Sequence, residues 1–216
     1  MVKQGRLVEG RVALALCAAL IAVAACRGGG EEPMPVPGFG ILSGQMVLVL
    51  PVQYVRPVPG GWIAGAANAE AAARQADLEI AFALGERGGR AMWVTPDQQI
   101  EALRRRPSIR VNPYAFSADE LRQKADKLRQ IRDPLYGEIR LLAALFDSRY
   151  AVWPLELVYV PEEDGTGGRL AIRTFLLDTR AGTVLWSGLV RGNDQPPASP
   201  GALAAAAQAF ALQVSP

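Results

Sequence analysis

The sequence contains no histidine and only two cysteines among its 216 residues. Histidine is the usual general base near neutral pH and a common zinc ligand, and the cysteine thiolate is a common nucleophile, so most catalytic and metal sites are disfavoured. Walker loops, G-x-S-x-G elbows, G-x-G-x-x-G fingerprints and H-E-x-x-H sites are also missing. We therefore expect no catalytic residue, no metal site and no cofactor, and we predict that the chain is not an enzyme.

The first 25 residues have the pattern of an export signal. Residues 1–11 carry three basic side chains against one acidic side chain, and residues 12–25 form an uncharged apolar run. This run is shorter than the roughly 20 residues that span a bilayer, which favours a cleaved signal peptide over a permanent transmembrane helix.

The apolar run ends in Val23-Ala24-Ala25-Cys26, which resembles the lipobox of bacterial lipoproteins. The resemblance implies cleavage before Cys26 and a covalent lipid on that residue, which would hold the chain on a membrane. Ordinary secretory cleavage near the same alanines is the alternative. Arg27 follows, and the absence of Asp at this position implies, by the same resemblance, sorting to the outer membrane with the protein facing the periplasm.

Cleavage would change both the thiol content and the charge. Cys17 lies within the apolar run, so the mature chain would keep no thiol for a disulfide, a metal cluster or a nucleophile. The removed segment holds three basic residues and one acidic residue, which leaves 20 of each in place of the formal net charge of +2. This balance gives no support to nucleic-acid binding.

Glycine and proline are frequent in residues 26–44, which we expect to form a flexible tether between the lipid and the domain. The alternative is an irregular segment packed on the domain. Residues 45–216 then form one domain, whose length suits a single sizeable core.

The first half of this domain has the pattern of a β-α-β unit. Residues 46–52 are a continuous apolar run, which predicts a central strand buried on both faces. Residues 69–87 are good helix formers, and Leu78 and Phe82, one turn apart, are expected on the side that faces the core. Two glycines would end this helix, and residues 91–94 return as a short strand.

The second half combines helices with β-rich runs. An N-cap and proline pair at 95–96 predicts a helix over 96–106, and Ser117 with Glu120 predicts a capping box for a helix over 118–130. Four β-rich runs and an alanine-rich helix follow, at 135–146, 153–160, 169–178, 183–190 and from 200 onward. The predicted order is β-α-β-α-α-β-β-β-β-α, a mixed α/β sheet of three-layer type whose late strands are antiparallel.

Several of these segments resemble the periplasmic α/β domain shared by the secretion lipoprotein CsgG, the penicillin-binding-protein activator LpoB and the N-terminal domain of TolB. The most specific carriers are the entry at residues 133–139 and the hairpin over 176–188, in which Asp178, Gly182 and Trp186 match a recurring pattern. The resemblance implies an architecture, not a catalytic site. General α/β lipoproteins that assist transport are the competing family, and a curli-type pore would need membrane-inserting hairpins for which the chain is too short.

Three carboxylates on the predicted strands could act as an acid and a base: Glu138, Glu156 and Asp178. Each has a structural alternative. Glu138 and Glu156 can face solvent or pair across strands with Arg140 and Arg173, and Asp178 can brace its own turn.

Two features are candidates for partner binding. Trp62 lies in a glycine-rich loop after the first strand, and the run Arg104, Arg105 and Arg106 ends a predicted helix. Packing of the tryptophan and solvation of the arginines at the negative helix end are the alternatives.

These features favour a lipid-anchored, non-enzymatic binding or assembly factor for a protein complex in the cell envelope, acting in secretion, transport or cell-wall synthesis. Its expected partners are the membrane, through the lipid, and an envelope protein. Two alternatives remain open: an oligomeric structural lipoprotein, a ring of identical copies built from exposed strand edges or the last helix, and an envelope hydrolase that uses the carboxylates.

Overall fold

The structure is a computed structural model that describes residues 38–58, 61–125, 127–162, 167–196 and 198–215. The described residues belong to one compact unit, Pro37–Pro216. The expected signal peptide and Cys26 therefore lie outside the described residues. Within the described ranges, no helix is both long enough and apolar enough to cross a membrane.

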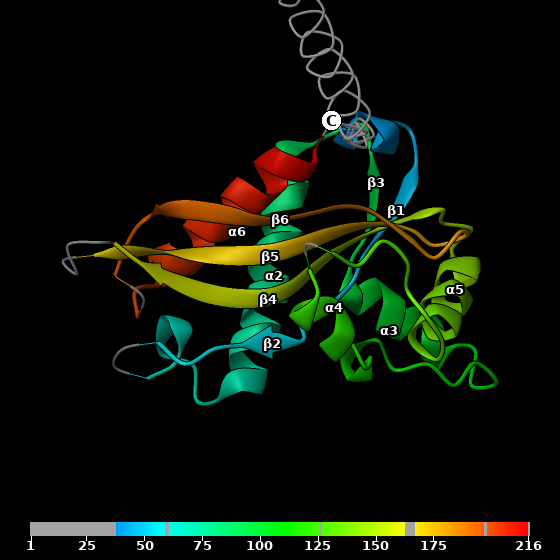
Figure 1. Cartoon of the computed structure of the whole chain (residues 1–216), viewed down its shortest axis with the longest axis horizontal. Helices are drawn as coiled ribbons and strands as arrows, with labels where there is room; N and C mark the ends of the chain where they lie inside the picture. The colour runs from blue at the N-terminus through cyan, green and yellow to red at the C-terminus, as the bar shows by residue number, and fades with distance from the viewer. Residues whose placement is uncertain (1–37, 59–60, 126, 163–166, 197, 216) are drawn as a thin grey trace, which may run out of the picture. The chain divides into compact units, whose positions relative to one another are not determined.

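A six-stranded mixed sheet forms the centre of the domain (Figure 1). The strands are β1 Met46–Val49, β2 Tyr54–Val55, β3 Met92–Val94, β4 Tyr150–Pro161, β5 Gly168–Asp178 and β6 Thr183–Asp194. Their order is β3-β1-β4-β5-β6, and β2 pairs with β4 further along the same edge as β1. The pairs of β1 with β3 and β4 are parallel, whereas β4, β5 and β6 are antiparallel. The predicted mixed α/β class with antiparallel late strands is confirmed.

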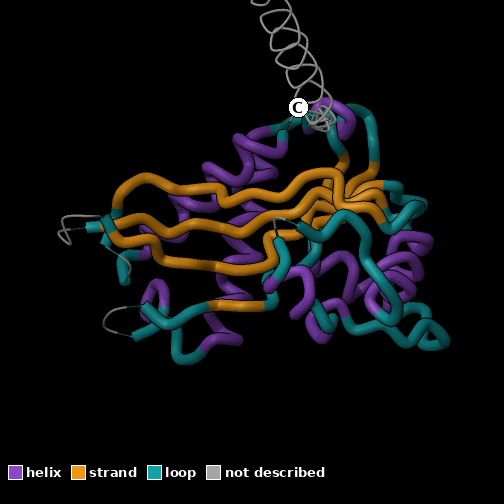
Figure 2. Tube along the Cα trace, viewed as in Figure 1, coloured by secondary structure: helices purple, strands orange, loops and turns teal. Residues whose placement is uncertain are grey.

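Helices cover both faces of this sheet (Figure 2). They are α2 Ala69–Arg87, α3 Pro96–Arg104, α4 Asp119–Gln123, α5 Leu135–Leu145 and α6 Pro200–Val214, with short 3-10 helices η1 Phe39–Leu42, η2 Ile63–Gly65 and η3 Pro113–Ala115. One buried cluster lies under α2 and α6, and a second lies under α3, α4 and α5. We call these two sides of the sheet the α6 face and the α4 face.

Strand β1 contributes to both cores. Val47 and Val49 belong to the cluster on the α6 face, and Leu48 belongs to the cluster on the α4 face. Successive side chains of a strand point to opposite faces, so a continuous apolar run fills both layers. The predicted central strand and the β-α-β unit of β1, α2 and β3 are both confirmed.

Helix α2 spans the predicted residues, but the side predicted to face the core is wrong. Leu78 and Phe82 are 60% and 64% exposed. The buried apolar side consists mainly of small residues: Ala72, Ala73, Ala76, Ile80, Ala83 and Leu84. Helix α6 also buries several alanines against this cluster, and small side chains allow two helices to approach closely. The large apolar residues of α2 therefore remain outside the contact.

Residues 135–146, predicted as a β-rich run, form helix α5 instead. The buried positions follow helical spacing: Leu135, Ile139, Leu142 and Ala143. The helix predicted over 118–130 is also shorter, because α4 ends at Gln123. Its N-cap is Ala118 without a side-chain bond, so the predicted capping box of Ser117 does not form. The observed order is β-β-α-β-α-α-α-β-β-β-α.

Other local predictions agree with the structure. The N–H group of Thr95 donates to the Gln98 side chain at 2.9 Å at the start of α3, and Gly88 ends α2 with a φ of 58°. Phe39 and Leu42 of η1 are buried in the cluster on the α6 face. The last residues of the expected tether are therefore packed on the domain.

Candidate functional site

The predicted partner-binding residues lie on opposite faces of the sheet. Trp62 is half-buried and precedes Ile63, which belongs to the core on the α6 face. The run Arg104–Arg106 follows Leu103, which belongs to the core on the α4 face, and its first two members pair with Glu101 at 3.9 and 2.9 Å. The structure does not bring these residues together, and their role in partner binding stays a prediction.

Asp178 braces the turn that it begins, as one of the two interpretations predicted. Its Oδ1 accepts hydrogen bonds from the backbone N–H groups of Arg180 and Ala181 at 3.0 and 3.1 Å. Its Oδ2 pairs with Arg149 at 2.9 Å, and this contact raises the pKa of Arg149. Both oxygens thus have structural partners.

Glu138 lies on helix α5, so the cross-strand pair predicted with Arg140 does not form. Residues two apart on a helix do not face each other.

A bulge in β4 delivers Glu156 to the α4 face. The pairing of β4 with β5 shifts by one residue between Pro154 and Glu156, so Glu156 rather than Leu155 lies opposite Arg173. Because the side-chain period of a strand is two, a shift of one residue exchanges the faces of every later side chain. The bulge therefore places a carboxylate on a face where an unbroken register would place leucine.

Three arginines converge on this carboxylate, which is 1% exposed. Arg56 after β2, Arg122 of α4 and Arg173 of β5 approach it with their Nε atoms at 2.9, 3.4 and 3.3 Å. We call Arg56, Arg122 and Arg173 the arginine cluster. The predicted ion pair of Glu156 with Arg173 is confirmed, and it is one of three ion pairs that Glu156 forms with described residues.

Glu156 and Asp178 are too far apart to act as an acid and a base on one bond. On β4, Glu156 lies six residues beyond Tyr150, the residue that pairs with Asp178. At about 3.3 Å per residue, the separation is roughly 20 Å, whereas the paired carboxyls of glycosidases lie about 5 to 10 Å apart.

Asp77 is a buried carboxylate that the sequence pattern does not single out. It lies on α2, is 5% exposed, and accepts the N–H group of Val52 through Oδ1 at 2.9 Å. No partner of Oδ2 is found among the described residues. Burial raises the pKa of Asp77 to about 7, although Tyr114 and Arg74 act in the opposite direction. The three residues line a pocket of about 210 Å³ beside the start of α3.

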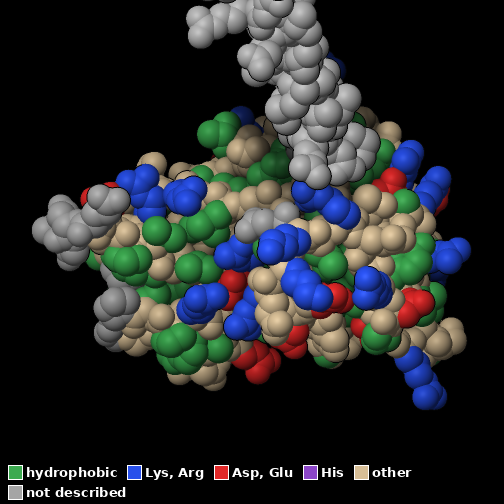
Figure 3. Space-filling view, viewed as in Figure 1, with side chains coloured by type: hydrophobic (Ala, Val, Ile, Leu, Met, Phe, Trp, Pro, Cys, Tyr) green, Lys and Arg blue, Asp and Glu red, His purple; other side chains and the backbone are tan. Residues whose placement is uncertain are grey.

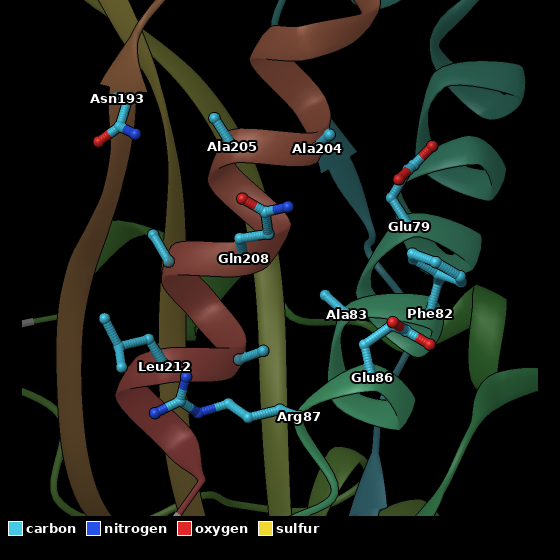
Figure 4. Close-up of a pocket in the computed structure, with 12 residues that line it drawn as sticks. Glu79, Phe82, Ala83, Glu86, Arg87, Asn193, Ala204, Ala205, Gln208 and Leu212 are labelled. Atoms are coloured by element: carbon cyan, nitrogen blue, oxygen red, sulfur yellow. The ribbon is translucent and has the colours of Figure 1, made fainter.

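A larger groove lies between α2 and α6 on the outer side of the α6 face (Figure 4). Its volume is about 540 Å³, and it is lined by Phe82 of α2 and Leu212 of α6, which are 64% and 60% exposed. Glu79 and Glu86 lie on either side of Phe82 along α2. Arg87 also lines the groove, which therefore combines apolar side chains with two acidic ones and one basic one.

The sequence indicates some of these residues and not others. Glu156 and Asp178 are candidates from the sequence, with the correct structural roles among the alternatives. Phe82 is predicted in the core, because two apolar stripes on α2 compete and periodicity alone does not say which is buried. Arg56 and Arg122 carry no signal, since they are 100 and 34 residues from Glu156 in the chain.

The fold and these surfaces define a three-layer mixed α/β domain with an apolar, acidic groove on one face and an arginine cluster on the other. No model of a known protein family matches the chain, and the comparison with curated proteins gives no match.

Three solved structures are similar at 17% identity and a TM-score of 0.37. The LpoB C-terminal domains from Salmonella enterica and Escherichia coli cover 74% and 69% of this chain, and 87% and 83% of their own chains are matched. A PelC dodecamer from Paraburkholderia phytofirmans covers 84% of this chain and is matched over 92% of its own. LpoB is one of the proteins that the sequence resembles, but at this TM-score no partner, assembly or activity is carried over.

Proposed function

We propose that this chain is a lipid-anchored, non-enzymatic accessory factor that docks onto a protein complex of the cell envelope, in secretion, transport or cell-wall synthesis. The observation that carries the proposal is the exposure of Phe82 and Leu212 at the groove between α2 and α6. Large apolar side chains that lie together in water mark surfaces that another molecule covers. Because Glu79 and Glu86 outnumber Arg87 in the lining, we expect a partner segment with apolar and basic side chains.

The N-terminal sequence supports the location. A basic stretch, an apolar run and Val23-Ala24-Ala25-Cys26 together form the pattern of a lipoprotein signal. Growth with an alkyne analogue of palmitate should label the full-length chain and leave the Cys26→Ala variant unlabelled. Equal labelling of the two would contradict the anchor.

The carboxylates support the non-enzymatic part. Glu156 and Asp178 are held by arginines and by backbone N–H groups, roughly 20 Å apart along the sheet. Such contacts occupy the carboxylate oxygens and favour a structural role for both residues.

The docking surface is tested by affinity purification of the tagged full-length chain from envelope extracts. Phe82→Ser should reduce the amount of the main co-purified protein about tenfold, since burying a Phe side chain contributes about 1.5 to 3 kcal/mol and 1.4 kcal/mol is tenfold in affinity. Leu141→Ser is the matched control, because Leu141 is an exposed leucine of α5 on the opposite face.

Equal recovery in Phe82→Ser and the wild type would contradict docking at the groove. If Trp62→Ala loses the main co-purified protein and Phe82→Ser retains it, the docking surface lies at Trp62, the residue predicted from the sequence. Recovery of further copies of this chain alone would favour the ring of identical subunits over an accessory factor.

A further inference from the structure

We infer that the arginine cluster binds a carboxylate carried by an acidic segment of the protein partner. The inference rests on the proposed function, because it names the chemistry of one partner segment. It concerns the α4 face, whereas the groove lies on the α6 face, so the two surfaces can be tested separately.

The cluster holds more positive charge than its internal carboxylate needs. Three arginines surround Glu156, and Asp119 lies nearby on α4, so three positive charges face two negative ones and one positive charge is in excess. Neighbouring guanidinium groups repel each other, and a second anion between them would relieve that repulsion. The side chains of Arg56, Arg122 and Arg173 are 56%, 37% and 26% exposed, so their outer parts reach solvent.

The arrangement is held in place before any ligand binds. Glu156 anchors the three Nε atoms, and the guanidinium of Arg122 also stacks on the ring of Tyr54 at 4.5 Å. The Tyr54 hydroxyl donates to Asp119 at 3.0 Å, which ties β2 to α4. Guanidinium groups fixed in this way can offer paired N–H donors to a carboxylate with little loss of side-chain freedom.

The surroundings of the cluster suit a polypeptide. Beyond α4 the strands β4, β5 and β6 continue without a covering helix on this face, and Lys and Arg side chains gather over β4 and α4, with Asp and Glu side chains beside them toward β2 (Figures 1 and 3). Val158 pairs with Ala171 and Leu189 pairs with Arg173, so both side chains lie on the same face as the arginine cluster. Both are half-buried. A bare phosphate would leave these apolar side chains in water, whereas an acidic segment with apolar residues covers them.

The test uses the full-length chain in a neutral detergent at low ionic strength. The probe is a fluorescein-labelled peptide of alternating glutamate and leucine, and the measurement is fluorescence anisotropy. Arg56→Gln should raise the Kd of this peptide at least about fivefold, because it removes a charged hydrogen-bond donor. The variant should fold, since Glu156 keeps Arg122 and Arg173.

Arg140→Gln is the matched control, since it removes the same charge from an exposed arginine of α5. We expect its Kd to stay within about twofold of the wild type, as general screening predicts for a distant surface charge. Equal shifts in the two variants, or no shift in either, would overturn the site.

Two further arms decide the chemistry of the anion. A peptide with glutamine in place of glutamate should have the same Kd for the wild type and for Arg56→Gln. Inorganic phosphate or phosphatidylglycerol vesicles that bind with the same dependence on Arg56 as the acidic peptide would overturn the carboxylate assignment. If Phe82→Ser still loses the envelope partner while Arg56→Gln has no effect on the peptide, the accessory function stands and only this site fails.

Discussion

Asp77 lies in an environment that differs strongly from that of its free side chain in water. Its carboxyl is buried on α2, and one oxygen accepts the backbone N–H group of Val52. Burial disfavours the charged form, which raises the pKa from the ordinary value of 3.8 to about 7. The folded chain therefore keeps a proton that the unfolded chain releases in mildly acidic solution.

This difference predicts a pH-dependent stability. The contribution of Asp77 is fully present below about pH 4 and is lost as the pH rises through about 7, where the folded state also loses its proton. About three pKa units correspond to roughly 4 kcal/mol. The free energy of unfolding of Asp77→Asn, relative to the wild type, should therefore increase by a few kcal/mol between pH 4 and pH 8.

Urea unfolding of both proteins across this range measures the difference, in which other titrating groups cancel. A constant difference between Asp77→Asn and the wild type would show that Asp77 titrates as it does in the unfolded chain.

At the residue scale, the sequence predicts contacts that are local or lie across a regular pair of strands. The turn role of Asp178 follows from its position before a glycine-containing connection, and the pair of Glu156 with Arg173 is one of the predicted alternatives. The contacts of Arg56 and Arg122 could not be predicted, because they depend on β2 and α4 meeting β4 in three dimensions. The bulge before Glu156 leaves no mark in the hydrophobic pattern.

The hairpin between β5 and β6 shows how an element depends on one glycine. Gly182 has a φ of 68°, and a Cβ atom at this position would lie 2.8 Å from the ring of Tyr136. The Tyr136 hydroxyl donates to the carbonyl of Arg180 at 2.7 Å, so the ring on α5 packs on the turn. The glycine is therefore needed for both the backbone conformation and the contact with α5.

Gly182→Ala should lower the free energy of unfolding by roughly 2 to 3 kcal/mol, the sum of the left-handed backbone cost and the displacement of Tyr136. Gly88→Ala is the control, because Gly88 also has a positive φ but a Cβ atom there would meet no neighbouring atom within 4 Å. The free energy of unfolding of Gly88→Ala should fall by only about 1 kcal/mol, the left-handed backbone cost alone. If chemical denaturation gives the same decrease in the free energy of unfolding for Gly182→Ala and Gly88→Ala, the contact with Tyr136 contributes nothing.

At the element scale, two predicted helix ends are confirmed, whereas the capping box predicted at Ser117 does not form. Gly88 ends α2 and Thr95 begins α3, as predicted, because these signals depend on backbone chemistry at one or two positions. The apolar content of residues 135–146 predicts a strand, although their buried positions follow helical spacing. On α2, close packing against α6 decides between two apolar stripes, which is a tertiary effect.

At the scale of the whole molecule, the two open surfaces lie on opposite faces of one sheet. The groove between α2 and α6 is apolar with two acidic side chains and one basic one, and the arginine cluster lies at α4, β2 and β5. The sequence predicts the class of the sheet and its antiparallel end, because strand spacing and turn chemistry are local. It does not predict which parts of the faces stay uncovered, because that depends on where α4 and α6 end.

The central claim, docking of an anchored chain through the groove, is tested most directly by site-specific photo-crosslinking in living cells. A photoreactive residue replaces Phe82 in the full-length chain, and the same residue at Leu141, on the opposite face, serves as the control. We predict that position 82 forms a cross-link with one envelope protein other than this chain, and that position 141 does not. Cross-links only between copies of this chain, or the same product from both positions, would contradict the account.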